Sequence, residues 1–387
     1  MQDLSHVTAG AALARVIVPA DARAVLTINL AALRANWATL DRKSGAAECA
    51  GVIKADAYGL GLEEIATALR DEGCKTFFVA TLAEARRLRS IDPSIVIYVL
   101  DGLLPGAAAH YAGFDLRPCL GSLDEIREWA EFCTAKGQRL RAAIHLDTGI
   151  NRLGLPAADV DVLAASPEVL GQFRCSLMMS HLACADEPLH PKNQQQRETF
   201  DLLRRKLPPA PASLANSAGT FLGAEFQYDL VRPGIALFGG RAFVGEANPM
   251  QWVVELKARI LQVRDVAEGD SVGYGASYTC DRPTRVATIA CGYADGFLRA
   301  ISRVDRSAGA VGFIGPHAVP VIGRVSMDLI TLDVTGVPAT LARRGGWVEV
   351  LGSRTTIDDL TDRAGTIGYE LLTRLGRRVH RVYVDST

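Results

Sequence analysis

The stretch Thr76-Phe-Phe-Val-Ala-Thr-Leu-Ala-Glu84-Ala-Arg-Arg-Leu-Arg89 joins an apolar run to a helix signal. The run of aromatic and β-branched residues predicts a buried strand. Thr81 followed three residues later by Glu84 is a capping box, which predicts that a helix begins here, and the arginines at its end would complement the helix dipole. The stretch is therefore one strand-then-helix unit, the repeating element of a parallel α/β fold.

Similar units flank this stretch as far as about Gly239. Ser122-Leu-Asp-Glu125 repeats the capping box, and residues 25–29 precede another helical pattern with Asn29 as its N-cap. Further strands are expected at residues 95–100, 141–146 and 176–180. So many strand-then-helix units favour a closed α/β barrel of the TIM type, although the pattern is also compatible with an open sheet.

After Gly240 the chain changes character. Apolar and polar residues alternate in segments separated by turns, at residues 252–263, 286–290, 318–322 and 329–334. This alternation predicts a mainly antiparallel β domain. We therefore expect an α/β barrel over residues 1–245 and a β domain over residues 246–387, with residues 1–20 as candidates to pack with the β domain instead.

Charge and cysteine usage narrow the function classes. The 42 Lys and Arg residues nearly balance the 43 Asp and Glu residues, which argues against nucleic acid or a membrane surface as a partner and favours a small molecule. The eight cysteines are scattered singly, as expected for buried thiols in a reducing compartment. Residues 1–15 lack a secretory pattern, and the apolar runs are too short to span a bilayer. We expect a cytoplasmic protein.

One lysine has a context that points to chemistry. Residues 51–61 read Gly-Val-Ile-Lys-Ala-Asp-Ala-Tyr-Gly-Leu-Gly, which places Lys54 at the end of a short apolar run. A buried ammonium costs several kcal/mol unless it is paired or loses its proton. An aldehyde cofactor would supply a partner by forming a Schiff base, and pyridoxal 5'-phosphate is the usual one. The plainer alternative is a strand-end lysine that reaches water.

The chain resembles the alanine racemases in eight blocks that follow the family's order. Besides residues 51–61, these blocks are Asp147-Thr-Gly-Ile-Asn-Arg152-Leu-Gly, Ser180-His181-Leu-Ala-Cys-Ala-Asp-Glu, Asn216-Ser217-Ala, Arg232-Pro-Gly-Ile-Ala-Leu, Gly273-Tyr274-Gly-Ala-Ser-Tyr, Gly292-Tyr293-Ala-Asp-Gly and Gly323-Arg-Val-Ser-Met327-Asp328. The resemblance implies a homodimeric enzyme that interconverts L- and D-alanine, the latter a precursor of peptidoglycan. A racemase of broader or serine specificity, a non-catalytic pyridoxal-phosphate-binding protein and a barrel-type decarboxylase are the alternatives.

The resemblance also implies a two-base mechanism on the external aldimine of substrate and cofactor. Lys54 would hold the cofactor and serve as the base on the D side, and Tyr274 of the other subunit would be the base on the L side. Racemisation needs a base on each face of a planar carbanion. Taken alone, Tyr274 is more typical of an aromatic residue packing on a sheet.

The remaining site residues are likewise carried over from the family. Arg232 would face the pyridine nitrogen, and His181 would lie against the cofactor ring. The cofactor's phosphate would be bound by Tyr58, Ser217, Gly234, Ile235 and Tyr369, and Asn216 would also belong to the cofactor-binding residues. Arg152 and the backbone at Met327 would bind the substrate carboxylate, with Tyr293 on the pocket wall. No metal is expected, because the histidines and cysteines lack zinc spacing.

Several of these residues have plainer interpretations in isolation. Asn-Ser and Pro-Gly dipeptides are ordinary turn formers, and a lone strand-end histidine is more often structural. One position also departs from the family pattern. Most members carry a carbamylated lysine two residues before Asp-Thr-Gly, where this chain has His145. Histidine forms no stable carbamate, so Arg152 lacks its expected anionic partner, for which Asp147 or a bound anion would have to substitute.

Overall fold

The computed structural model describes residues 18–245, 247–303 and 309–385, which form two compact units. The barrel unit comprises Leu33–Leu237 and Arg241–Met250. The β unit comprises the described residues up to Ala32, Phe238–Gly240, and the described residues from Gln251 onward. Residues 1–17, which hold most of the segment expected to pack with the β domain, lie outside the described residues. No helix in the described part is both long and apolar enough to cross a membrane.

The barrel unit is built on parallel strands, as the repeated strand-then-helix pattern predicted. Seven of them pair in the order of the chain, and β2 pairs with β10. The strands are β2 (Glu48–Cys49), β3 (Gly51–Val52), β4 (Thr76–Val79), β5 (Val96–Val99), β6 (Arg117–Leu120), β7 (Arg141–His145), β8 (Arg174–Met179), β9 (Ala212–Ser213) and β10 (Leu230–Val231).

Backbone hydrogen bonds close these strands into a ring. Arg232 N–H donates to the Ala215 carbonyl at 2.9 Å, which links the segment after β10 to the segment after β9. On the other side, Val52 N–H donates to the Pro233 carbonyl at 3.0 Å, which links the β10 segment back to β3. The ring confirms the TIM-like barrel. A buried apolar core is formed by side chains of the strands, namely Val52, Phe78, Tyr98, Cys119, Ala143, Leu177, Met179 and Leu230, together with Ala50 between β2 and β3.

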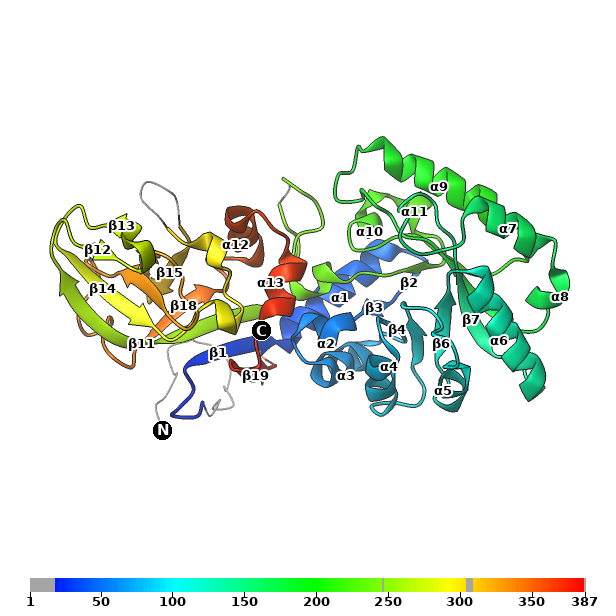
Figure 1. Ribbon diagram of the computed structural model, residues 1–387, viewed down its shortest axis with the longest axis horizontal. Helices are drawn as coiled ribbons and strands as arrows, with labels where there is room; N and C mark the ends of the chain where they lie inside the picture. Colours follow the sequence, from blue (N-terminus) through cyan, green and yellow to red (C-terminus); the bar gives the residue numbers. More distant parts are fainter. Residues whose placement is uncertain (1–17, 246, 304–308, 386–387) are drawn as a thin grey trace. The chain divides into compact units, whose positions relative to one another are not determined.

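Helices surround the strands on the outside (Figure 1). They are α1 (Leu30–Ser44), α2 (Lys54–Tyr58), α3 (Leu62–Glu72), α4 (Leu82–Arg89), α5 (Ala108–Gly113), α6 (Leu123–Lys136), α7 (Ala157–Ala164), α8 (Pro167–Leu170), α9 (Pro191–Arg204), α10 (Gly219–Leu222) and α11 (Ala224–Gln227). The longer ones connect consecutive strands, so their apolar faces pack on the ring while their polar faces meet water.

The predicted helix starts are confirmed, with one difference in detail. Thr81 and Glu84 form the full capping box of α4, and Asn29 Oδ1 accepts the Ala32 N–H at 3.0 Å. At α6, Ser122 Oγ accepts the Glu125 N–H at 3.2 Å, as predicted. The Glu125 carboxylate, however, accepts the Gly121 N–H instead of the Ser122 N–H, because its other oxygen binds the Leu103 N–H in the loop after β5.

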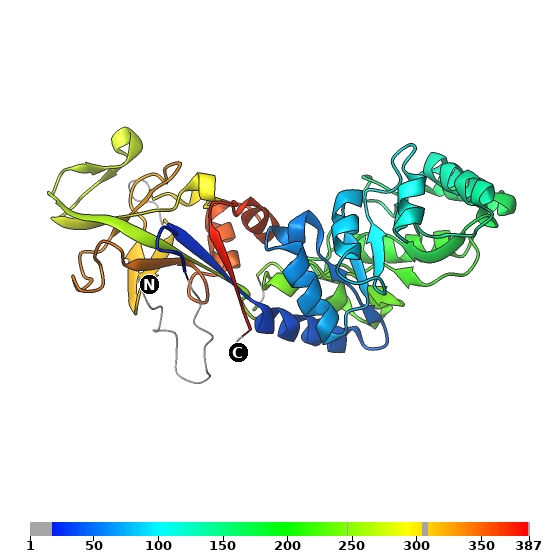
Figure 2. The ribbon, with the colours of Figure 1, turned by 90° about the horizontal axis from the view of Figure 1, so that it is seen from below.

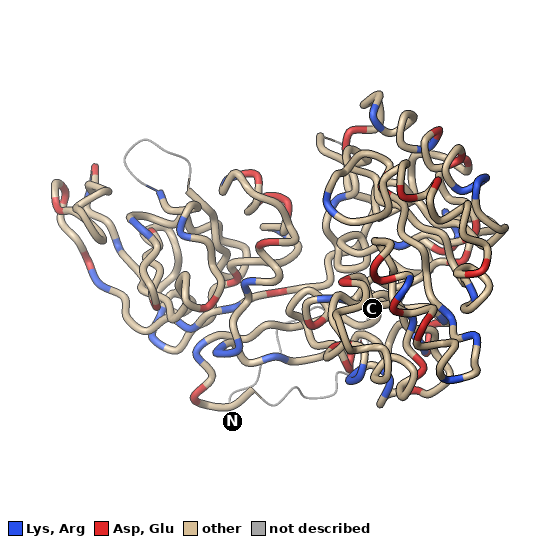
Figure 3. The backbone as a smooth tube through the Cα atoms, turned by 45° about the vertical axis from the view of Figure 1, so that its right-hand side comes forward, with Lys and Arg blue, Asp and Glu red and all other residues tan. Residues whose placement is uncertain are grey.

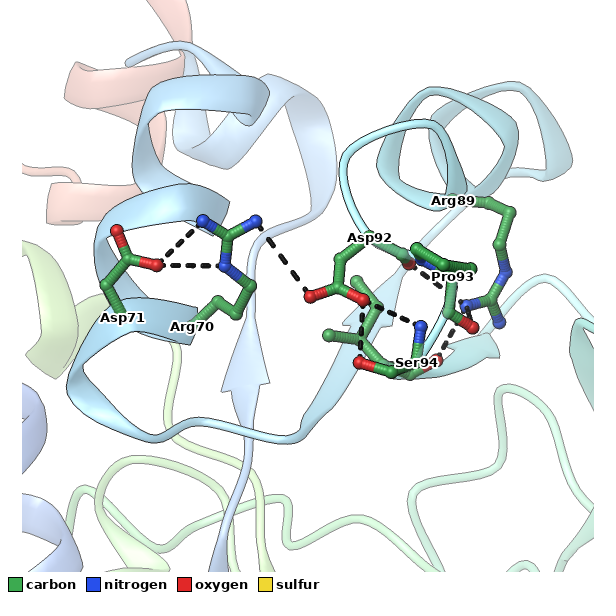
Figure 4. Close-up of polar contacts among 7 residues, drawn as sticks. Arg70, Asp71, Arg89, Asp92, Pro93 and Ser94 are labelled. Atoms are coloured by element: carbon green, nitrogen blue, oxygen red, sulfur yellow. Dashed lines mark hydrogen bonds and ion pairs between the residues drawn. The ribbon is translucent and has the colours of Figure 1, made fainter.

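The loop between α4 and β5 lies at the amino end of the strands and is densely hydrogen-bonded (Figure 4). Arg89 Nη1 donates to the carbonyls of Pro93 at 2.9 Å and Ile95 at 2.8 Å. Asp92 Oδ1 accepts from the N–H of Ser94 at 2.7 Å, and the other oxygen of Asp92 lies 3.9 Å from Arg70 of α3. These contacts tie two helices and a strand together, a purely structural role typical of this end of a barrel.

The β unit contains the alternating segments expected after Gly240. It comprises β1 (Ala24–Asn29), β11 (Val254–Val266), β12 (Ser271–Val272), β13 (Tyr278–Thr279), β14 (Thr284–Ile289), β15 (Val311–Ile314), β16 (His317–Pro320), β17 (Ile330–Asp333), β18 (Trp347–Leu351) and β19 (His380–Val384). All its sheet pairings are antiparallel except that of β1 with β19, which confirms the mainly antiparallel domain.

The first strand corrects one expectation. β1 forms where the sequence predicted it, but it does not begin the barrel. It pairs antiparallel with β11 and parallel with β19 in the β unit (Figure 2). Its local pattern, apolar residues followed by a helix, is that of a barrel unit. The sheet that β1 joins is decided by pairing partners far along the chain, which cannot be predicted from the local sequence pattern.

Two helices near the carboxyl end have no counterpart in the sequence-based expectations. α12 (Ile357–Ala364) begins at a capping box formed by Thr356 and Asp359, and α13 (Gly368–Arg374) follows it. Acidic and basic residues are interspersed along the chain of both units (Figure 3), as the balanced composition leads one to expect.

Candidate active site

Nine of the residues expected in the site belong to the barrel unit, and they follow the carboxyl ends of its strands. Lys54 and Tyr58 follow β3, Arg152 follows β7 and His181 follows β8. Asn216 and Ser217 follow β9, while Arg232, Gly234 and Ile235 follow β10. Because all the strands are parallel, their carboxyl ends lie at one rim of the ring. The fold therefore brings together residues that are up to 181 positions apart in the sequence, from Lys54 to Ile235.

Lys54 is half-buried at this rim. Within the described part of the chain its ammonium has no hydrogen-bonding or ion-pair partner. Burial lowers the pKa of Lys54, and the nearby Arg152 guanidinium lowers it further, whereas Asp101 and Glu84 act in the opposite direction. An amine with a lowered pKa is a better nucleophile at neutral pH, which is what bond formation with an aldehyde requires.

The chain leaves Lys54 in an unusual conformation. Ala55, Asp56, Ala57 and Tyr58 have φ angles of 55°, 56°, 52° and 58°, so α2 is one turn of left-handed helix. For L-residues this conformation costs about 1–2 kcal/mol per residue. The turn ends at Gly59, whose φ of 82° is easily adopted by glycine. Strain of this size persists only where the surroundings hold it, and it is concentrated at functional sites.

Tyr58, at the end of this turn, lies against Gly234. Tyr58 is only 4% exposed, and a Cβ on Gly234 would collide with its hydroxyl oxygen. Ser217 Oγ accepts the N–H of Gly234 at 2.8 Å and that of Ala236 at 3.3 Å. Ile235, which lies between these two residues, is the first residue of the short helix η1 (Ile235–Phe238). Ser217 Oγ, which accepts these two N–H groups, can still donate its own proton, and the Tyr58 hydroxyl lies beside the same segment. Hydroxyl donors grouped in this way suit an anion such as a phosphate.

Asn216 has a local role in the structure. Its Oδ1 accepts the Gly219 N–H at 2.9 Å, and its Nδ2 lies 3.4 Å from the Leu182 carbonyl. These contacts shape the turn that leads into α10, so they agree with the plainer interpretation of Asn216 as a turn former. The turn in turn places Ser217 next to η1.

Arg232 is the most deeply buried cation of the site, with 4% exposure. Its guanidinium donates to Ser213 Oγ and to the Ser180 carbonyl, and lies 5.9 Å from the Phe78 ring. Burial lowers the pKa of Arg232 to about 10, which still leaves it charged at neutral pH. It has no carboxylate partner among the described residues, so its charge is available to a ligand.

The two histidines of this rim are both kept neutral. Burial, reinforced by Arg232, lowers the pKa of His145 to about 4 and that of His181 well below its ordinary value. The Nε2 atom of His145 is buried and lacks a hydrogen-bond partner in the described structure. His145 therefore does not provide the negative charge that a carbamylated lysine would provide at this position.

Asp147 does not replace that charge either. Its Oδ1 accepts three backbone N–H groups of its own loop, from Gly149 at 2.9 Å, Ile150 at 3.1 Å and Asn151 at 3.2 Å. These bonds shape the loop that carries Arg152. Arg152 itself is exposed and forms no ion pair within the described residues.

A buried glutamine that the sequence did not reveal supports His181. Gln196 of α9 is fully buried and donates to the His181 carbonyl at 2.8 Å and to Thr148 Oγ1 at 3.1 Å. Its Oε1 accepts the Ala183 N–H at 2.8 Å. It stands in the polar run Asn-Gln-Gln-Gln, which carries no signal that one glutamine faces inward.

Four further residues expected in the site belong to the β unit. Tyr274, at the start of η2 (Tyr274–Ala276), is 71% exposed and Met327 is 54% exposed. Tyr293 N–H donates to the Ser326 carbonyl at 3.0 Å. Gly273, the residue before Tyr274, lies close to the Arg324 backbone. The segment from 323 to 327 thus touches the backbone beside both tyrosines and brings three of the four residues together.

Tyr369 lies on α13, whose carboxyl end packs near the loop that carries Tyr293. Gly376 N–H donates to the Asp295 carbonyl at 2.9 Å, and Gly296 lies directly against the Arg374 carbonyl. The side chain of Asp295 in turn binds Arg378 at 2.9 Å. The β unit therefore presents its four expected site residues on connected loops.

Comparison with known proteins identifies the family. Residues 28–242 match the model of the alanine racemase N-terminal domain, and residues 253–383 match that of the C-terminal domain. The chain belongs to the alanine racemase family. An alanine racemase of Methylobacterium sp. (strain 4-46) is 50% identical over 93% of this chain and 97% of its own length. A catabolic alanine racemase of Mesorhizobium japonicum is 47% identical over 95% of both chains.

The structural comparison agrees with this assignment to the alanine racemases. The crystal structure of the alanine racemase from Bartonella henselae with covalently bound pyridoxal phosphate matches with a TM-score of 0.88 and 37% identity. The match covers 94% of this chain and 100% of that one. The resemblance inferred from the eight sequence blocks is thereby confirmed.

Proposed function

We propose that this chain interconverts L- and D-alanine with pyridoxal phosphate by moving the α-proton between Lys54 and Tyr274. The observation that carries the proposal is the state of Lys54. Its half-buried amine, with a lowered pKa and no acceptor in the described part, lies on the rim that also carries the donor cradle and Arg232. A free amine next to an anion cradle is what a phosphate-bearing aldehyde needs.

The residues of this rim fit the cofactor. Pyridoxal phosphate, when bound, withdraws electrons from the substrate Cα and makes its proton removable. Tyr58, Ser217 and the N–H groups around Gly234 and Ile235 would hold the phosphate, and the missing Cβ of Gly234 leaves the backbone accessible. Tyr369 would complete the cradle.

Arg232 would control how strongly the cofactor withdraws electrons. Its guanidinium is fixed by Ser213 and Ser180 and remains charged. A cation facing the pyridine nitrogen disfavours protonation of that nitrogen. Electron withdrawal is then moderate, which restrains side reactions such as transamination. His181, kept neutral by burial, would lie against the ring without adding charge.

Proton transfer on the second face requires Tyr274. We assign Lys54 to the D side and Tyr274 to the L side of the substrate carbon. Arg152 and the Met327 backbone would bind the substrate carboxylate, with Tyr293 on the pocket wall. A guanidinium without an ion-pair partner suits that carboxylate.

We further propose a homodimer in which each site receives the partner's Tyr274. Tyr274 and Met327 are exposed large side chains on connected loops, together with the 41% exposed Tyr369. Monomeric proteins rarely leave such side chains grouped in the open, because their burial against a partner is favourable. The homodimer would be cytoplasmic, as the singly placed cysteines favour, and would supply D-alanine for peptidoglycan.

The site assignments are tested by labelling and subunit exchange. Borohydride reduction of the holoenzyme should place the cofactor on Lys54, and the protein should convert L-alanine to D-alanine. Mixing inactive Lys54→Ala and Tyr274→Phe homodimers should restore activity, because one site of each heterodimer is then intact. Mixing Lys54→Ala with the double variant is the matched control and should restore none. A label on another lysine, or no recovery despite proven exchange, would contradict the proposal.

A half-reaction distinguishes the two faces. Single-turnover α-deuterium exchange in Tyr274→Phe should persist with D-alanine and fall about 10²–10⁴-fold with L-alanine, the usual effect of losing a general base. Equal exchange of both enantiomers would contradict the assignment. Rates with serine and larger amino acids measured alongside define the specificity, and a preference for serine would replace alanine as the main substrate.

A further inference from the structure

Glu84 makes more contacts than a capping box requires. Its Oε2 accepts the N–H of Thr81 at 3.2 Å, which is the capping bond, and also the N–H of Ala80 at 3.0 Å. Its Oε1 accepts the N–H of Asp56 at 3.1 Å. One carboxylate therefore connects the start of α4 to the segment that follows Lys54.

The target of this third bond is the left-handed turn. Asp56 is its second residue, between Lys54 and Tyr58, with a φ of 56°. Within the turn, Ala57 N–H donates to the Ile53 carbonyl at 2.9 Å and Gly59 N–H to the Ala55 carbonyl at 2.8 Å. Ala, Asp, Ala and Tyr do not favour this conformation on their own, so contacts from outside the turn decide whether it forms.

A second glutamate of the barrel forms the same pattern of hydrogen bonds. Glu125 occupies the equivalent place in α6, and its Oε1 accepts the N–H of Leu103, in the loop after β5, at 2.8 Å. Its Oε2 accepts the N–H of Gly121 at 2.7 Å. In both cases a glutamate at the start of a helix binds the loop that follows the neighbouring barrel strand, which is β3 for Glu84 and β5 for Glu125. Only the loop bound by Glu84 carries proposed site residues.

We propose that Glu84 is a positioning residue, whose carboxylate holds the left-handed turn and thereby sets the directions in which Lys54 and Tyr58 leave the barrel rim. This inference rests on the proposed role of Lys54. It adds a residue of α4 that touches neither substrate nor cofactor. Glu84 acts through one backbone N–H, so its effect should appear as a change in cofactor retention.

Charge provides a second consequence of the same contact. The charged and titratable groups around Lys54 are Arg152, His181, Asp101 and Glu84. Glu84 and Asp101 raise the pKa of Lys54, against the larger lowering by burial and Arg152. Removing the charge of Glu84 should therefore lower the pKa of the free Lys54 amine further. For the same electrostatic reason it should lower the pH midpoint at which the Schiff-base nitrogen between Lys54 and the bound cofactor loses its proton, which the visible absorption reports.

The experiment compares Glu84→Gln with Glu125→Gln in the holoenzyme. Glutamine keeps the length of the side chain but replaces one acceptor oxygen with an NH₂ group, which cannot accept an N–H. Both variants should lose similar thermal stability. Glu84→Gln should release pyridoxal phosphate roughly tenfold faster than wild type, whereas Glu125→Gln should release it at the wild-type rate.

A rescue variant separates positioning from helix capping. Glycine adopts positive φ without the penalty of an L-residue, and the Ala55 methyl is exposed, so Ala55→Gly favours the turn while removing little packing. Adding Ala55→Gly to Glu84→Gln should restore most of the cofactor retention. If Glu84→Gln does not fold, recovery of folding by Ala55→Gly supports the proposal, and failure of the double variant to fold contradicts it.

The outcomes also separate this inference from the proposed function. Equal cofactor release by Glu84→Gln and Glu125→Gln, or no rescue by Ala55→Gly, overturns the role of Glu84 alone. A reduced wild type whose label lies on a lysine other than Lys54 overturns the proposed function itself, whatever the glutamine variants do.

Discussion

The two ends of the barrel strands satisfy their polar groups in opposite ways. At the amino ends, Arg89 and Asp92 have their hydrogen-bonding capacity used by nearby backbone and by Ser94 (Figure 4). At the carboxyl ends, Lys54 and His145 are buried or half-buried with groups left unpaired in the described structure. Paired groups stabilise the fold, whereas unpaired buried groups reduce its stability and remain available to a ligand. Four substitutions test this contrast.

The largest effect is expected at Lys54. Lys54→Ala should abolish covalent attachment of pyridoxal phosphate and its visible absorption, because no equivalent amine would remain at the rim. Lys75→Ala is the matched control, since Lys75 is an exposed lysine at the amino end of β4. It should leave absorption and borohydride labelling unchanged. Retained absorption in Lys54→Ala would place the reactive amine elsewhere.

His145 should make stability depend on pH. Its folded-state pKa of about 4 lies below the ordinary value of 6.5, so the folded protein binds fewer protons than the unfolded chain. The associated stability is fully present above pH 6.5 and is lost as the pH falls towards 4, by about 3 kcal/mol. In urea unfolding from pH 7.5 to 4, His145→Gln should flatten this dependence in part, since His181 contributes with the same sign. Unchanged slopes would show that His145 is not held neutral.

Gly234→Ala should weaken cofactor binding. The added methyl would meet the Tyr58 hydroxyl, so the cradle must open, and we expect a dissociation constant roughly 10- to 100-fold higher. Adding Tyr58→Phe removes the oxygen that the methyl meets most closely and should recover only part of the loss, because the ring carbon Cζ still lies 3.1 Å from the methyl and one proposed phosphate donor is lost. Gly113→Ala, in α5 on the amino side of β6, has open space around the new methyl and should bind normally. Equal binding by both alanine variants would mean that the cradle tolerates bulk.

The smallest effect is expected at the amino ends. Arg89→Met should lower the free energy of unfolding by about 1 kcal/mol, because several carbonyls lose a charged donor but can partly turn to water. The dissociation constant of pyridoxal phosphate should stay at its wild-type value. A weakened cofactor affinity in Arg89→Met would show that the two ends of the barrel are coupled.

Much of the barrel could be predicted because its signals are local. Thr81 and Glu84 define a helix start within four residues, and the aromatic run before them defines a strand. The placement of β1 could not be predicted, since its partners β11 and β19 lie more than 200 residues further along the chain. Pairing of this kind depends on the assembled sheet.

The site shows the same division. The family motifs predicted the residues of the proposed site, and the strand ends explain why nine of them meet at one rim of the barrel. The left-handed turn was not predicted, because Ala55 to Tyr58 contain no glycine that would signal positive φ. Gln196 and the third bond of Glu84 were missed for a related reason. A helix pattern shows which face a side chain occupies, and says nothing about which distant N–H it will reach.

The placement of β1 bears on how the protein is made. A ribosome completes β1 long before β11, and at ordinary synthesis rates the interval is on the order of ten seconds or more. During that time the barrel strands emerge in order and can pair, while β1 remains an apolar strand without its sheet. β19 covers its other edge later still. β1 is therefore exposed to aggregation for most of synthesis, and chaperone binding during that interval would be directed at residues 24–29.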